Sequence, residues 1–595
     1  MDACREIDVR VPIYISAGVD NTVTQTHPGW REIDAQGRLA GWNTSPLQAG
    51  FYKLCFNTPY LDYLCRQIEE AVTLFPEADG VFLDIINQGQ CCCNWCMEQM
   101  AKDGLDPERE EHRKQAARAA LDRYYKASTA ACKIRDPAMP VFHNSGHVLR
   151  GRREIVEYQS HLELESLPTG GWGYDHFPES ASYASHLNRD YLGMTGKFHT
   201  SWGEFGGFKH PNALRYECAS MIAFGARCSV GDQLHPDGRL DPSTYNAIGL
   251  AYSEVAAREP WCKGTEAVAN IAILSSQAEN GQGAEQDNAD TGASRVLLEG
   301  HQLFTLIDRD VDFEGFKLVI LPDNITVDDA LLAKISAYVA KGGKLLLTGT
   351  SGITKSGNGF ALDIGAAHFG ESPFTPDYVL PAPGCRASFV QAPMVMYPRS
   401  QRIKAGTGES LGQVFDPYFN RTYRHFCSHQ HTPNRPDPSG YDAGVRHGNV
   451  VYLAHPVFTL YCGYGAVAVK EYVLKVIADL LGEDRLVSTN LPSTARITLR
   501  RQPAEERHIV HLFHANKALR GGNAKQLGAP AGAAIEVIED LDPLHDITVA
   551  VRLGTGISRV TLEPQGKSIP YAVNDGWVET KVDSFTCHQM IVFHQ

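Results

Sequence analysis

Acidic side chains stand where apolar segments end, and such groups can carry acid–base or nucleophilic chemistry. Asp84 follows the apolar run GVFL, and Glu163 and Glu165 stand two residues apart in HLELESLPTG. Residues two apart lie on the same face of a strand, and neighbouring carboxylates raise the pKa of one member of the pair, as a general acid requires. Carboxylate pairs across a cleft are typical of glycoside hydrolysis. The structural alternative is that Asp84 caps a helix or pairs with a base, and that the glutamates orient arginines or lysines.

Aromatic and hydrogen-bonding side chains gather after the same kind of apolar run. Aromatic rings can stack on the apolar faces of a sugar, and imidazole, amide and carboxylate groups can bind its hydroxyls. Any one of them is more often a packed residue, so the prediction rests on their joint placement. The candidates are Trp172, Tyr174, Trp202, Phe205, His143, Asn144, His147, His199, Asp232 and His235.

The segment DGVFLDIINQGQCCCNWC raises the question of a metal. Cys91, Cys93 and Cys96 offer three thiolates, with Cys92 pointing away. Structural zinc usually has four ligands, often in two separated pairs, and no second pair is present. Cys65 or a histidine would complete a site only if the fold happened to bring it close. We therefore expect no metal and interpret these thiols as packed residues of the loop after the strand.

A second group of potential ligands, His425, His429 and His431, falls in the Pro- and Asn-rich stretch YFNRTYRHFCSHQHTPNRPDPSG. These histidines lack a helical His-x-x-x-His context with a nearby acid. We expect a loop that contacts substrate or another subunit, without a metal.

The elements that must position these residues alternate between short apolar runs and long helical patterns from Met1 as far as Pro260. This alternation predicts a parallel sheet with helices outside it. A doubly wound sheet places its ligands at one switch point, whereas a barrel collects them from the carboxyl ends of several strands. Six runs with polar ends favour a (β/α)8-type barrel whose first two strand–helix units are missing from the sequence as written. The six runs are VPIYISAGVD, GVFLDII, MPVFHNSG, HLELESLPTG, YLGMTGKFHTSW and ARCSVGDQLHP.

The pattern changes twice farther along the chain. Near Val268 the runs VANIAILSS, FKLVILPD and GGKLLLTGTSG alternate with helices such as DDALLAKISAYVAK, which predicts a flavodoxin-like α/β domain. After Arg485 short alternating runs predict an antiparallel β-sandwich. The predicted domains are therefore a catalytic barrel over residues 1–264, the second α/β domain over 265–484 and the β-sandwich over 485–595.

Composition excludes several classes of function. The 595 residues carry a net charge of −14 without a basic tract, which argues against nucleic acid or an anionic membrane as partner. No apolar run approaches the roughly 18–20 residues of a membrane span, and MDACREIDVR lacks a signal-peptide core. Fifteen scattered cysteines predict reduced thiols in the cytoplasm. No phosphate-binding loop, dinucleotide fingerprint or serine-hydrolase elbow is present, so no cofactor is expected.

A family resemblance becomes visible in the longer motifs. DGVFLDI with CCCNWC, PVFHNSGH, HLELESLPTGGWGYDHFP, TGKFHTSWGEFGG and GDQLHPDGRLD resemble the barrel called hypothetical glycosyl hydrolase 6. EGHQLFTLID, FKLVILPD and GGKLLLTGTSG resemble the β-galactosidase trimerisation domain. The combination, with a C-terminal β domain, resembles the α-L-fucosidases of glycoside hydrolase family 151.

This resemblance implies a retaining mechanism in which a carboxylate at the end of the fourth barrel strand is the nucleophile. If two strand units precede Met1, that residue is Asp84. The acid/base then comes from the sixth strand as Glu165 or Glu163, with Glu204 of WGEFGG as the alternative. The resemblance also implies a trimer or hexamer, in which His429 and His431 would reach a neighbouring pocket.

The favoured hypothesis is a cytoplasmic, retaining exo-α-L-fucosidase that acts on an oligosaccharide or glycoside. The alternatives are a β-galactosidase-like glycosidase, a carbohydrate-binding homologue made inactive by an incomplete barrel and, last, a zinc-dependent hydrolase.

Overall fold

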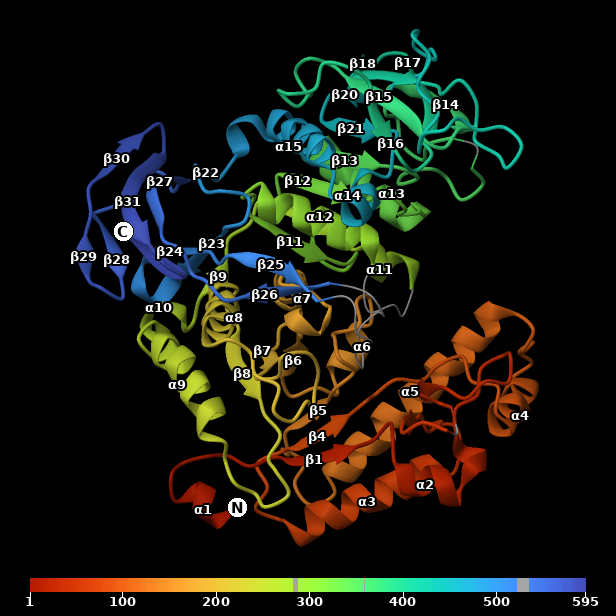
Figure 1. Cartoon of the computed structure of the whole chain (residues 1–595), viewed down its shortest axis with the longest axis vertical. Coiled ribbons are helices and arrows are strands. Elements are labelled where there is room, and N and C mark those ends of the chain that lie inside the picture. The colour runs from red at the N-terminus through yellow and green to blue at the C-terminus, as the bar shows by residue number, and fades with distance from the viewer. Residues whose placement is uncertain (46, 282–286, 358, 522–533) are drawn as a thin grey trace. The chain divides into compact units, whose positions relative to one another are not determined.

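The computed structural model describes residues 1–595 except 46, 282–286, 358 and 522–533 (Figure 1). Its contacts divide the chain into two compact units. The first comprises residues 1–148, 152–165 and 187–192, and the second comprises 149–151, 166–186 and 193–595. Each unit is described by itself below. The three predicted domains do not coincide with these units, and their boundaries stay predictions.

A three-stranded parallel sheet, in the order β1-β4-β5, organises the first unit. Its strands are β1 (Ile13–Ser16), β4 (Val81–Asp84) and β5 (Val141–His143). Ser16 pairs with Asp84, and Leu83 pairs with His143. Val81 and Leu83 are buried, as expected of a parallel strand covered on its faces. The register therefore brings Asp84 and the residue after His143 to the same carboxyl edge of the sheet.

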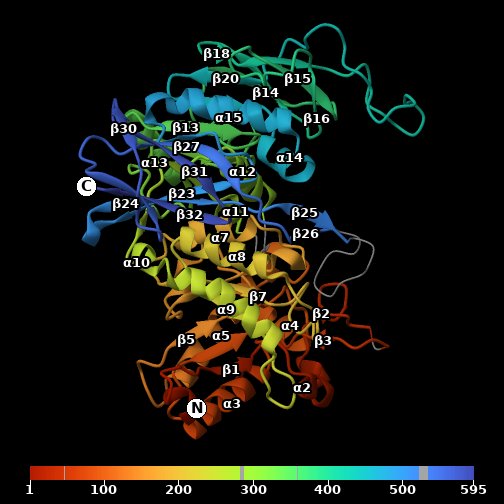
Figure 2. The same ribbon diagram turned by 60° about the vertical axis from the view of Figure 1, so that its left-hand side comes forward.

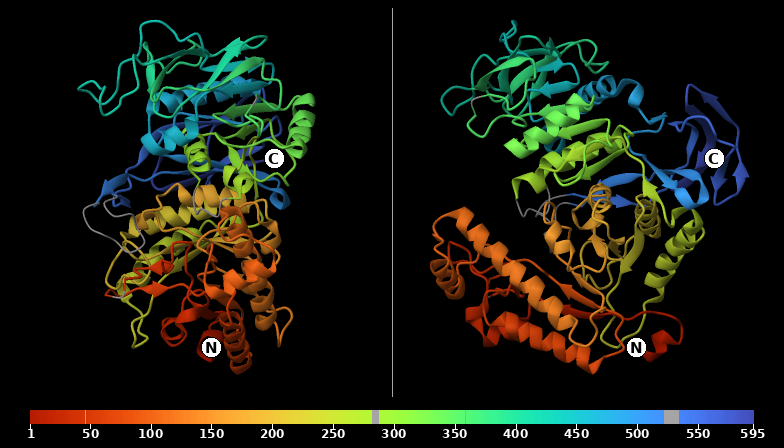
Figure 3. Two further views of the ribbon diagram at one scale, coloured as in Figure 1. Left: turned by 90° about the vertical axis from the view of Figure 1, so that its right-hand side faces the viewer. Right: turned by 180° about the vertical axis from the view of Figure 1, so that it is seen from behind.

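Helices α3 (Tyr60–Leu74) and α5 (Glu110–Cys132) lie side by side in the same unit (Figure 3). Tyr60, Leu64, Ile68 and Val72 are buried along α3. Their spacing of four residues gives the helix one apolar face. In α5, Tyr124 and Tyr125 are buried and stack edge to face. These helices supply the core against which the strands are fixed.

All six strands predicted before Pro260 are present. Besides β1, β4 and β5 they are β6 (Leu162–Glu165), β7 (Tyr191–Gly196) and β8 (Arg227–Gly231). The other elements of this stretch are α1 (Asp2–Arg5), α2 (Asn21–Thr26), β2 (Gly41–Trp42), β3 (Phe51–Tyr52), α4 (Asn94–Lys102), α6 (Arg153–Val156), α7 (His176–Ala184), α8 (Pro211–Ala223), α9 (Pro242–Ala256) and α10 (Glu259–Cys262).

A seven-stranded sheet within the second unit has the order β11-β10-β12-β13-β21-β20-β18. Numbered along the chain, its five parallel strands follow the order 2-1-3-4-5, which is that of flavodoxin-like sheets. Its strands are β10 (Ile271–Leu274), β11 (Phe304–Ile307), β12 (Leu318–Leu321), β13 (Lys344–Thr348), β18 (Glu409–Ser410), β20 (Gly444–His447) and β21 (Val450–Leu453). Its helices are α11 (Ser276–Asn280), α12 (Asn288–Glu299), α13 (Asp329–Ala340), α14 (Val457–Tyr464) and α15 (Val467–Leu481).

An insertion between β13 and β20 adds two small sheets and a long loop over residues 416–443 (Figure 2). Residues 417–436 carry Arg421, Arg424 and Arg435 but no acidic residue. Tyr423 is 83% exposed and Phe426 is 61% exposed. The segment 417–436, which lies between Asp416 and Asp437, is therefore a cationic, aromatic surface on an acidic chain. The additional strands are β14 (Ala366–Glu371), β15 (Asp377–Pro381), β16 (Met394–Met396), β17 (Gln401–Ala405) and β19 (Gly412–Phe415).

Two antiparallel sheets form most of the C-terminal part, in the orders β22-β27-β31-β30 and β29-β28-β32-β24-β23-β9. Leu499, Val510, Val549 and Val578 from both sheets share one buried cluster. Their strands are β9 (Glu266–Ala267), β22 (Val487–Thr489), β23 (Arg496–Gln502), β24 (Arg507–Phe513), β27 (Leu544–Arg552), β28 (Arg559–Glu563), β29 (Lys567–Ser568), β30 (Tyr571–Asn574), β31 (Trp577–Phe585) and β32 (His588–His594), and a separate hairpin joins β25 (Lys517–Arg520) to β26 (Ile535–Ile538).

Among the described residues, no helix combines the length and the apolar character that crossing a membrane requires.

Candidate active site

Asn144 connects two carboxylates that lie at the carboxyl ends of strands in the first unit. Its Nδ2 lies 2.8 Å from Oδ1 of Asp84 and 3.0 Å from Oε2 of Glu165. Asp84 is the last residue of β4, Glu165 is the last residue of β6, and Asn144 directly follows β5. Glu165 and Asn144 are 8% and 7% exposed. The amide thus donates one hydrogen to each acid and holds the two at a fixed separation.

The separation of the two acids identifies the chemistry they suit. Both oxygens contact one nitrogen, so the distance between them cannot exceed the sum of the two contacts, 2.8 Å and 3.0 Å. Retaining glycosidases hold their carboxyl groups about 5–5.5 Å apart, and inverting enzymes about 6.5–9.5 Å apart. Two charged carboxylates at this separation repel by about 3 kcal/mol at an effective dielectric constant of ~20. That repulsion is relieved when one carboxyl carries the proton that acid catalysis needs.

Tyr14, which the sequence analysis missed, is a third member of this cluster. Its hydroxyl donates to Oδ2 of Asp84 at 2.5 Å, so both oxygens of Asp84 accept a hydrogen bond. Tyr14 is 60% exposed, and its ring stacks on Phe82. Burial of the hydroxyl, reinforced by Asp84, raises the pKa of Tyr14 well above its usual range, and the phenol therefore stays a donor. In the sequence, only the alternation of residues in VPIYIS could have indicated that the Tyr14 side chain lies on one face of a strand.

The backbone turns sharply directly after Asp84. Ile85 has a φ of +63°, which is strained for a β-branched residue. The carbonyl of Asp84 accepts from the N–H groups of Ala17 and Gly18, at 2.9 and 3.1 Å. A Cβ on Gly18 would lie 1.9 Å from the carbonyl oxygen of Ile85. The backbone of Asp84, the candidate nucleophile, is thus fixed by these hydrogen bonds and by the close contact between Gly18 and Ile85.

The other two predicted acids have different surroundings. Glu163 lies two residues before Glu165 and its Oε1 is 2.8 Å from Nε2 of His161. Glu204 lies in the second unit, where its Oε2 accepts from the N–H of Thr200 at 2.8 Å. Within the described part of the chain, neither has a contact with Asn144 like that of Glu165, and this difference favours Glu165 among the three glutamates.

His143, the last residue of β5, and His147, in the loop that follows, differ in their exposure. His143 is 2% exposed, with Nδ1 3.1 Å from the Tyr124 hydroxyl and Nε2 3.0 Å from Oγ1 of Thr129. Burial lowers the pKa of His143 to about 3, so it is a neutral core residue here and its predicted substrate contact has no support. His147 is half-buried in the following loop, where its carbonyl accepts from the Ser145 hydroxyl.

Several predicted substrate contacts surround a hollow of about 260 Å³ after β7 and β8, within the second unit. Lys197 and Asp232 face each other across 3.9 Å, and the rings of Phe205 and His235 lie 5.0 Å apart. A hollow of this size with aromatic walls and both charges suits part of a saccharide. Lys197 was not predicted. Its Nζ also lies over the rings of Phe198 and Phe208.

The remaining barrel candidates divide into exposed and buried groups. His199 is exposed, and Trp202 is 36% exposed with its ring edge-on to Phe198. Trp172 is half-buried against His176. Tyr174 is 4% exposed and packs on Tyr216, so its predicted stacking on substrate has no support in this arrangement.

The histidines of the 417–436 loop are not gathered like metal ligands. His425 stacks on Phe419 and His431 lies beside Tyr397. His429 is exposed, and its carbonyl accepts from the Cys427 thiol. Among the described residues, these histidines belong to no group of potential metal ligands.

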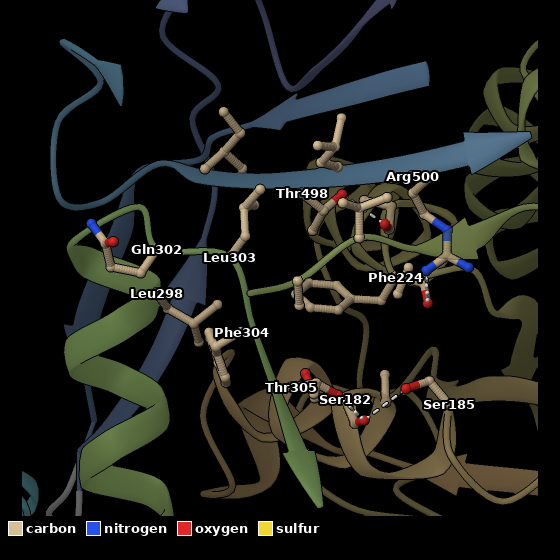
Figure 4. A pocket seen from close by; sticks show the side chains of 17 residues that line it. Ser182, Ser185, Phe224, Leu298, Gln302, Leu303, Phe304, Thr305, Thr498 and Arg500 are labelled. Atoms are coloured by element: carbon tan, nitrogen blue, oxygen red, sulfur yellow. Dashed lines mark hydrogen bonds between the residues drawn. The ribbon is translucent and has the colours of Figure 1, made fainter. Parts of the chain in front are cut away.

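A second cavity, lined by Phe224, Thr305, Thr498 and Arg500 among others, is too small for a sugar (Figure 4). Its volume of about 40 Å³ has room for one or two water molecules. Arg500 donates to the carbonyl of Phe224 at 3.1 Å, and Thr305 donates to that of Ser182 at 2.9 Å. It is a packing void within the second unit.

Four thiols form the one group of potential metal ligands found in the described part of the chain. Cys55 joins Cys91, Cys93 and Cys96, with all four sulfurs within 4.8 Å of one another. The sequence placed the last three together but gave no reason to select Cys55.

Comparisons with known proteins show which families the chain resembles. Residues 1–85 match the family model "Hypothetical glycosyl hydrolase 6", and residues 300–365 match "Beta-galactosidase trimerisation domain". No curated protein sequence matches the chain. The solved structure of α-L-fucosidase isoenzyme 2 from Paenibacillus thiaminolyticus is 43% identical, with a TM-score of 0.93, over 100% of this chain and 88% of that one.

More distant structures share the fold. The β-galactosidase from Bacillus circulans sp. alkalophilus has a TM-score of 0.69 at 14% identity, over 100% of this chain and 90% of that one. The cold-adapted β-galactosidase from Rahnella sp. R3 has a TM-score of 0.66 at 14% identity, over 99% and 89% of the two chains.

The match to a glycosyl hydrolase family model and the 43% identical α-L-fucosidase structure therefore define the chain as a glycoside hydrolase. The flavodoxin-like sheet contains the region that matches the trimerisation domain. With 43% identity over its whole length, the chain belongs to the family of the Paenibacillus thiaminolyticus α-L-fucosidase.

Proposed function

We propose that the chain is a retaining exo-α-L-fucosidase in which Asp84 is the nucleophile and Glu165 the acid/base. The observation that carries the mechanism is the single Asn144 amide, which contacts one carboxylate at 2.8 Å and the other at 3.0 Å. The sum of these two contacts is the upper limit of the distance between the two contacting oxygens, Oδ1 of Asp84 and Oε2 of Glu165, and it lies below the ~6.5 Å at which inverting spacings begin.

Each residue of the cluster has a defined part in the two steps. Asp84 attacks the anomeric carbon while the Glu165 carboxyl gives its proton to the leaving oxygen, which forms a glycosyl ester and releases the alcohol. Glu165, now a carboxylate, takes a proton from water, whose oxygen displaces Asp84. Tyr14 and Asn144 each donate to one oxygen of Asp84, and they stabilise the carboxylate when it is released.

The sugar is proposed from the relative that is 43% identical and is described as an α-L-fucosidase. The β-galactosidases at 14% identity support the fold alone. The test is a panel of aryl α-L-fucoside, β-galactoside, α-galactoside and β-mannoside. We expect hydrolysis of the fucoside at a kcat/KM far above the rest. Preference for the β-galactoside, or no turnover of any of the four, would contradict the proposal.

The stereochemical part has a separate measurement. Proton NMR of the first sugar released from the aryl α-L-fucoside should show the α anomer before mutarotation, because two displacements restore the configuration. Initial appearance of the β anomer would mean that the two acids do not act as nucleophile and acid/base of a retaining enzyme.

We further propose that the chain is a cytoplasmic homo-oligomer. The match to the trimerisation domain and the exposed 417–436 loop support assembly, and fifteen free thiols suit a reducing compartment. Light scattering after size-exclusion chromatography should give a trimer or hexamer mass, and a monomer mass at all concentrations would contradict the assembly.

A further inference from the structure

The four clustered thiols are enclosed within the first unit. Cys55, Cys91, Cys93 and Cys96 are 0%, 4%, 2% and 6% exposed. The sulfurs of Cys55 and Cys96 are 3.4 Å apart, too far for a disulfide bond of about 2.05 Å. A tetrahedral zinc with Zn–S bonds of about 2.3 Å requires S–S separations near 3.8 Å. All six separations here are below 4.8 Å, so small side-chain rotations would reach that geometry.

Backbone and amide N–H groups point at these sulfurs, as expected around thiolates. Cys91 Sγ accepts from the N–H groups of Ile33 and Cys93, at 3.5 and 3.4 Å. Cys55 Sγ accepts from the N–H of Asn57 and from Nε2 of Gln88, at 3.4 and 3.5 Å. Cys93 is also the N-cap of α4 (Asn94–Lys102), where the helix dipole favours negative charge. These donors stabilise thiolate charge that four packed, neutral thiols would not have.

We propose that Cys55, Cys91, Cys93 and Cys96 bind one Zn²⁺ that anchors the segment after Asp84. Four thiolates fill a tetrahedral shell, so the ion has no open position for substrate and its role is structural. Soft sulfur ligands favour Zn²⁺ over Mg²⁺ or Ca²⁺. On binding, the thiols release their protons to solvent.

The anchoring follows from the chain segments that meet at the thiols. Residues 85–90 connect Asp84 to Cys91, and Gln88 within them donates to Cys55 and accepts from the N–H of Phe56 at 2.9 Å. The N–H of Cys92 donates to the carbonyl of Ile33 at 2.6 Å. One ion would therefore join the segments around residues 33, 55 and 88–96, which are far apart in sequence.

The test measures metal in the full chain purified under reducing conditions from zinc-supplemented medium. Elemental analysis should find one zinc per chain, and cobalt reconstitution should give thiolate charge-transfer and tetrahedral d–d absorption bands. Cys93→Ser should lose the metal. Cys92→Ser is the matched control and should keep it, because the Cys92 sulfur is directed to the carbonyl of Gln90. No stoichiometric zinc or cobalt in the wild type, or equal metal in Cys93→Ser, would overturn the site.

The anchoring role has its own readout. Hydrogen exchange of residues 85–96 should accelerate when a mercurial reagent displaces the ion, while exchange in the seven-stranded sheet stays the same. Unchanged exchange in 85–96 would overturn the anchoring. Neither measurement depends on which sugar the protein hydrolyses.

A second inference rests on the proposed role of Asp84 and concerns the backbone strain beside it. Ile85 at φ +63° turns the chain so that the N–H of Ile86 donates to the carbonyl of Asn144 at 2.8 Å. The N–H of Asn144 in turn donates to the carbonyl of Leu83 at 2.7 Å. The strained residue thus closes the backbone connection between the nucleophile and the amide that holds it.

We infer that Ile85 and Gly18 are positioning residues for Asp84. Gly18 provides the space in which the carbonyl of Ile85 lies, since a Cβ there would be 1.9 Å from that oxygen. The branched side chain of Ile85 disfavours a φ of +63°, so the surrounding hydrogen bonds hold the backbone there in a strained conformation. Together they restrict the direction of the Asp84 carboxylate.

Kinetics of the aryl α-L-fucoside test this inference. Ile85→Gly should lower kcat about tenfold or more with KM little changed and with unchanged or higher thermal stability, whereas Ile85→Val should retain the wild-type kcat. Gly18→Ala should lower kcat up to about 100-fold. If Asp84→Gly is inactive but Ile85→Gly matches the wild type, this inference fails alone. If Asp84→Gly is active, the proposed function fails with it.

Discussion

The carboxylate cluster and the thiol cluster lie in the same unit and are separated by a short segment of chain, yet they are built in opposite ways. The carboxylates of Asp84 and Glu165 meet at the open edge of a sheet, where the neighbouring Tyr14 ring is 60% exposed. The four thiols are closed off, with no member more than 6% exposed. Asp84 and Tyr14 thus remain partly accessible in the first group, whereas every member of the second is enclosed.

This contrast shows which features distinguish a potential catalytic cluster from a structural one in this unit. Both clusters collect residues that are distant in sequence, and both receive N–H donors. The carboxylates have one shared amide between them and keep a separation suited to a sugar carbon, whereas the sulfurs approach one another closely enough for a single ion. Spacing and access, more than the type of residue, separate a catalytic site from a structural one.

The largest expected effect is on the carboxylate side. Asp84→Gly should lower kcat on the aryl α-L-fucoside by roughly 10⁴-fold or more, because the covalent step is lost. Thermal stability should change little, since Asp84 is only half-buried. Azide should restore part of the turnover and yield a fucosyl azide. Turnover within about tenfold of wild type, without an azide effect, would remove Asp84 from the role of nucleophile.

Glu165→Gln should have the next effect, a loss of roughly 10²–10⁴-fold in kcat, because the amide cannot protonate the leaving oxygen. The loss should shrink for a dinitrophenyl glycoside, whose leaving group needs no proton. Glu163→Gln is the matched control on the same strand and should retain most of the activity. A reversed result, with Glu163→Gln the more damaging change, would exchange the roles of the two glutamates.

Substitutions in the thiol cluster should change the stability of the protein and not its catalytic rate. Cys96→Ser should lower the free energy of unfolding by a few kcal/mol, measured by urea denaturation, while the folded fraction keeps a kcat near that of the wild type. Cys92→Ser should leave both quantities unchanged. If Cys96→Ser abolished turnover in fully folded protein, the separation between a catalytic and a structural cluster would be wrong.

Tyr14→Phe should give the smallest effect, a decrease in kcat of about tenfold, which is the lower end of the ~1.5–3 kcal/mol expected for one hydrogen bond to a charged group. Asn144 still donates to the other oxygen of Asp84 in this variant. Pre-steady-state measurement would show whether the first or second displacement is slowed. A loss as large as that of Asp84→Gly would mean that Tyr14 takes a direct part in the reaction.

Much of the fold could be predicted from local patterns. All six strands predicted before Pro260 are present, because each is a continuous apolar run closed by turn residues. The restart near Val268 correctly predicted the parallel sheet that begins with β10. The closure of the six strands into a barrel stays a prediction, since local patterns do not determine how strands far apart in sequence associate.

The site residues were predictable only where a side chain able to act as an acid, a base or a hydrogen-bond donor stands at the end of a predicted strand. Asp84, Asn144 and Glu165 each end or follow a strand, and the structure brings them together. Tyr14 and Cys55 could not be selected, because their partners are about 70 and 40 residues away and depend on register. His143 was selected for its hydrogen-bonding atoms and Tyr174 for its ring, but both lie in the core, and burial is a property of the complete fold.

The cationic 417–436 loop has a consequence for how the protein responds to its surroundings. Its three arginines project from a chain with a net charge of −14, so contacts between this loop and a second copy would be attractive at long range. Such attraction is screened over about 8 Å at physiological ionic strength. The association constant should therefore fall as salt is added, which would make ionic strength a control on how many copies share one assembly.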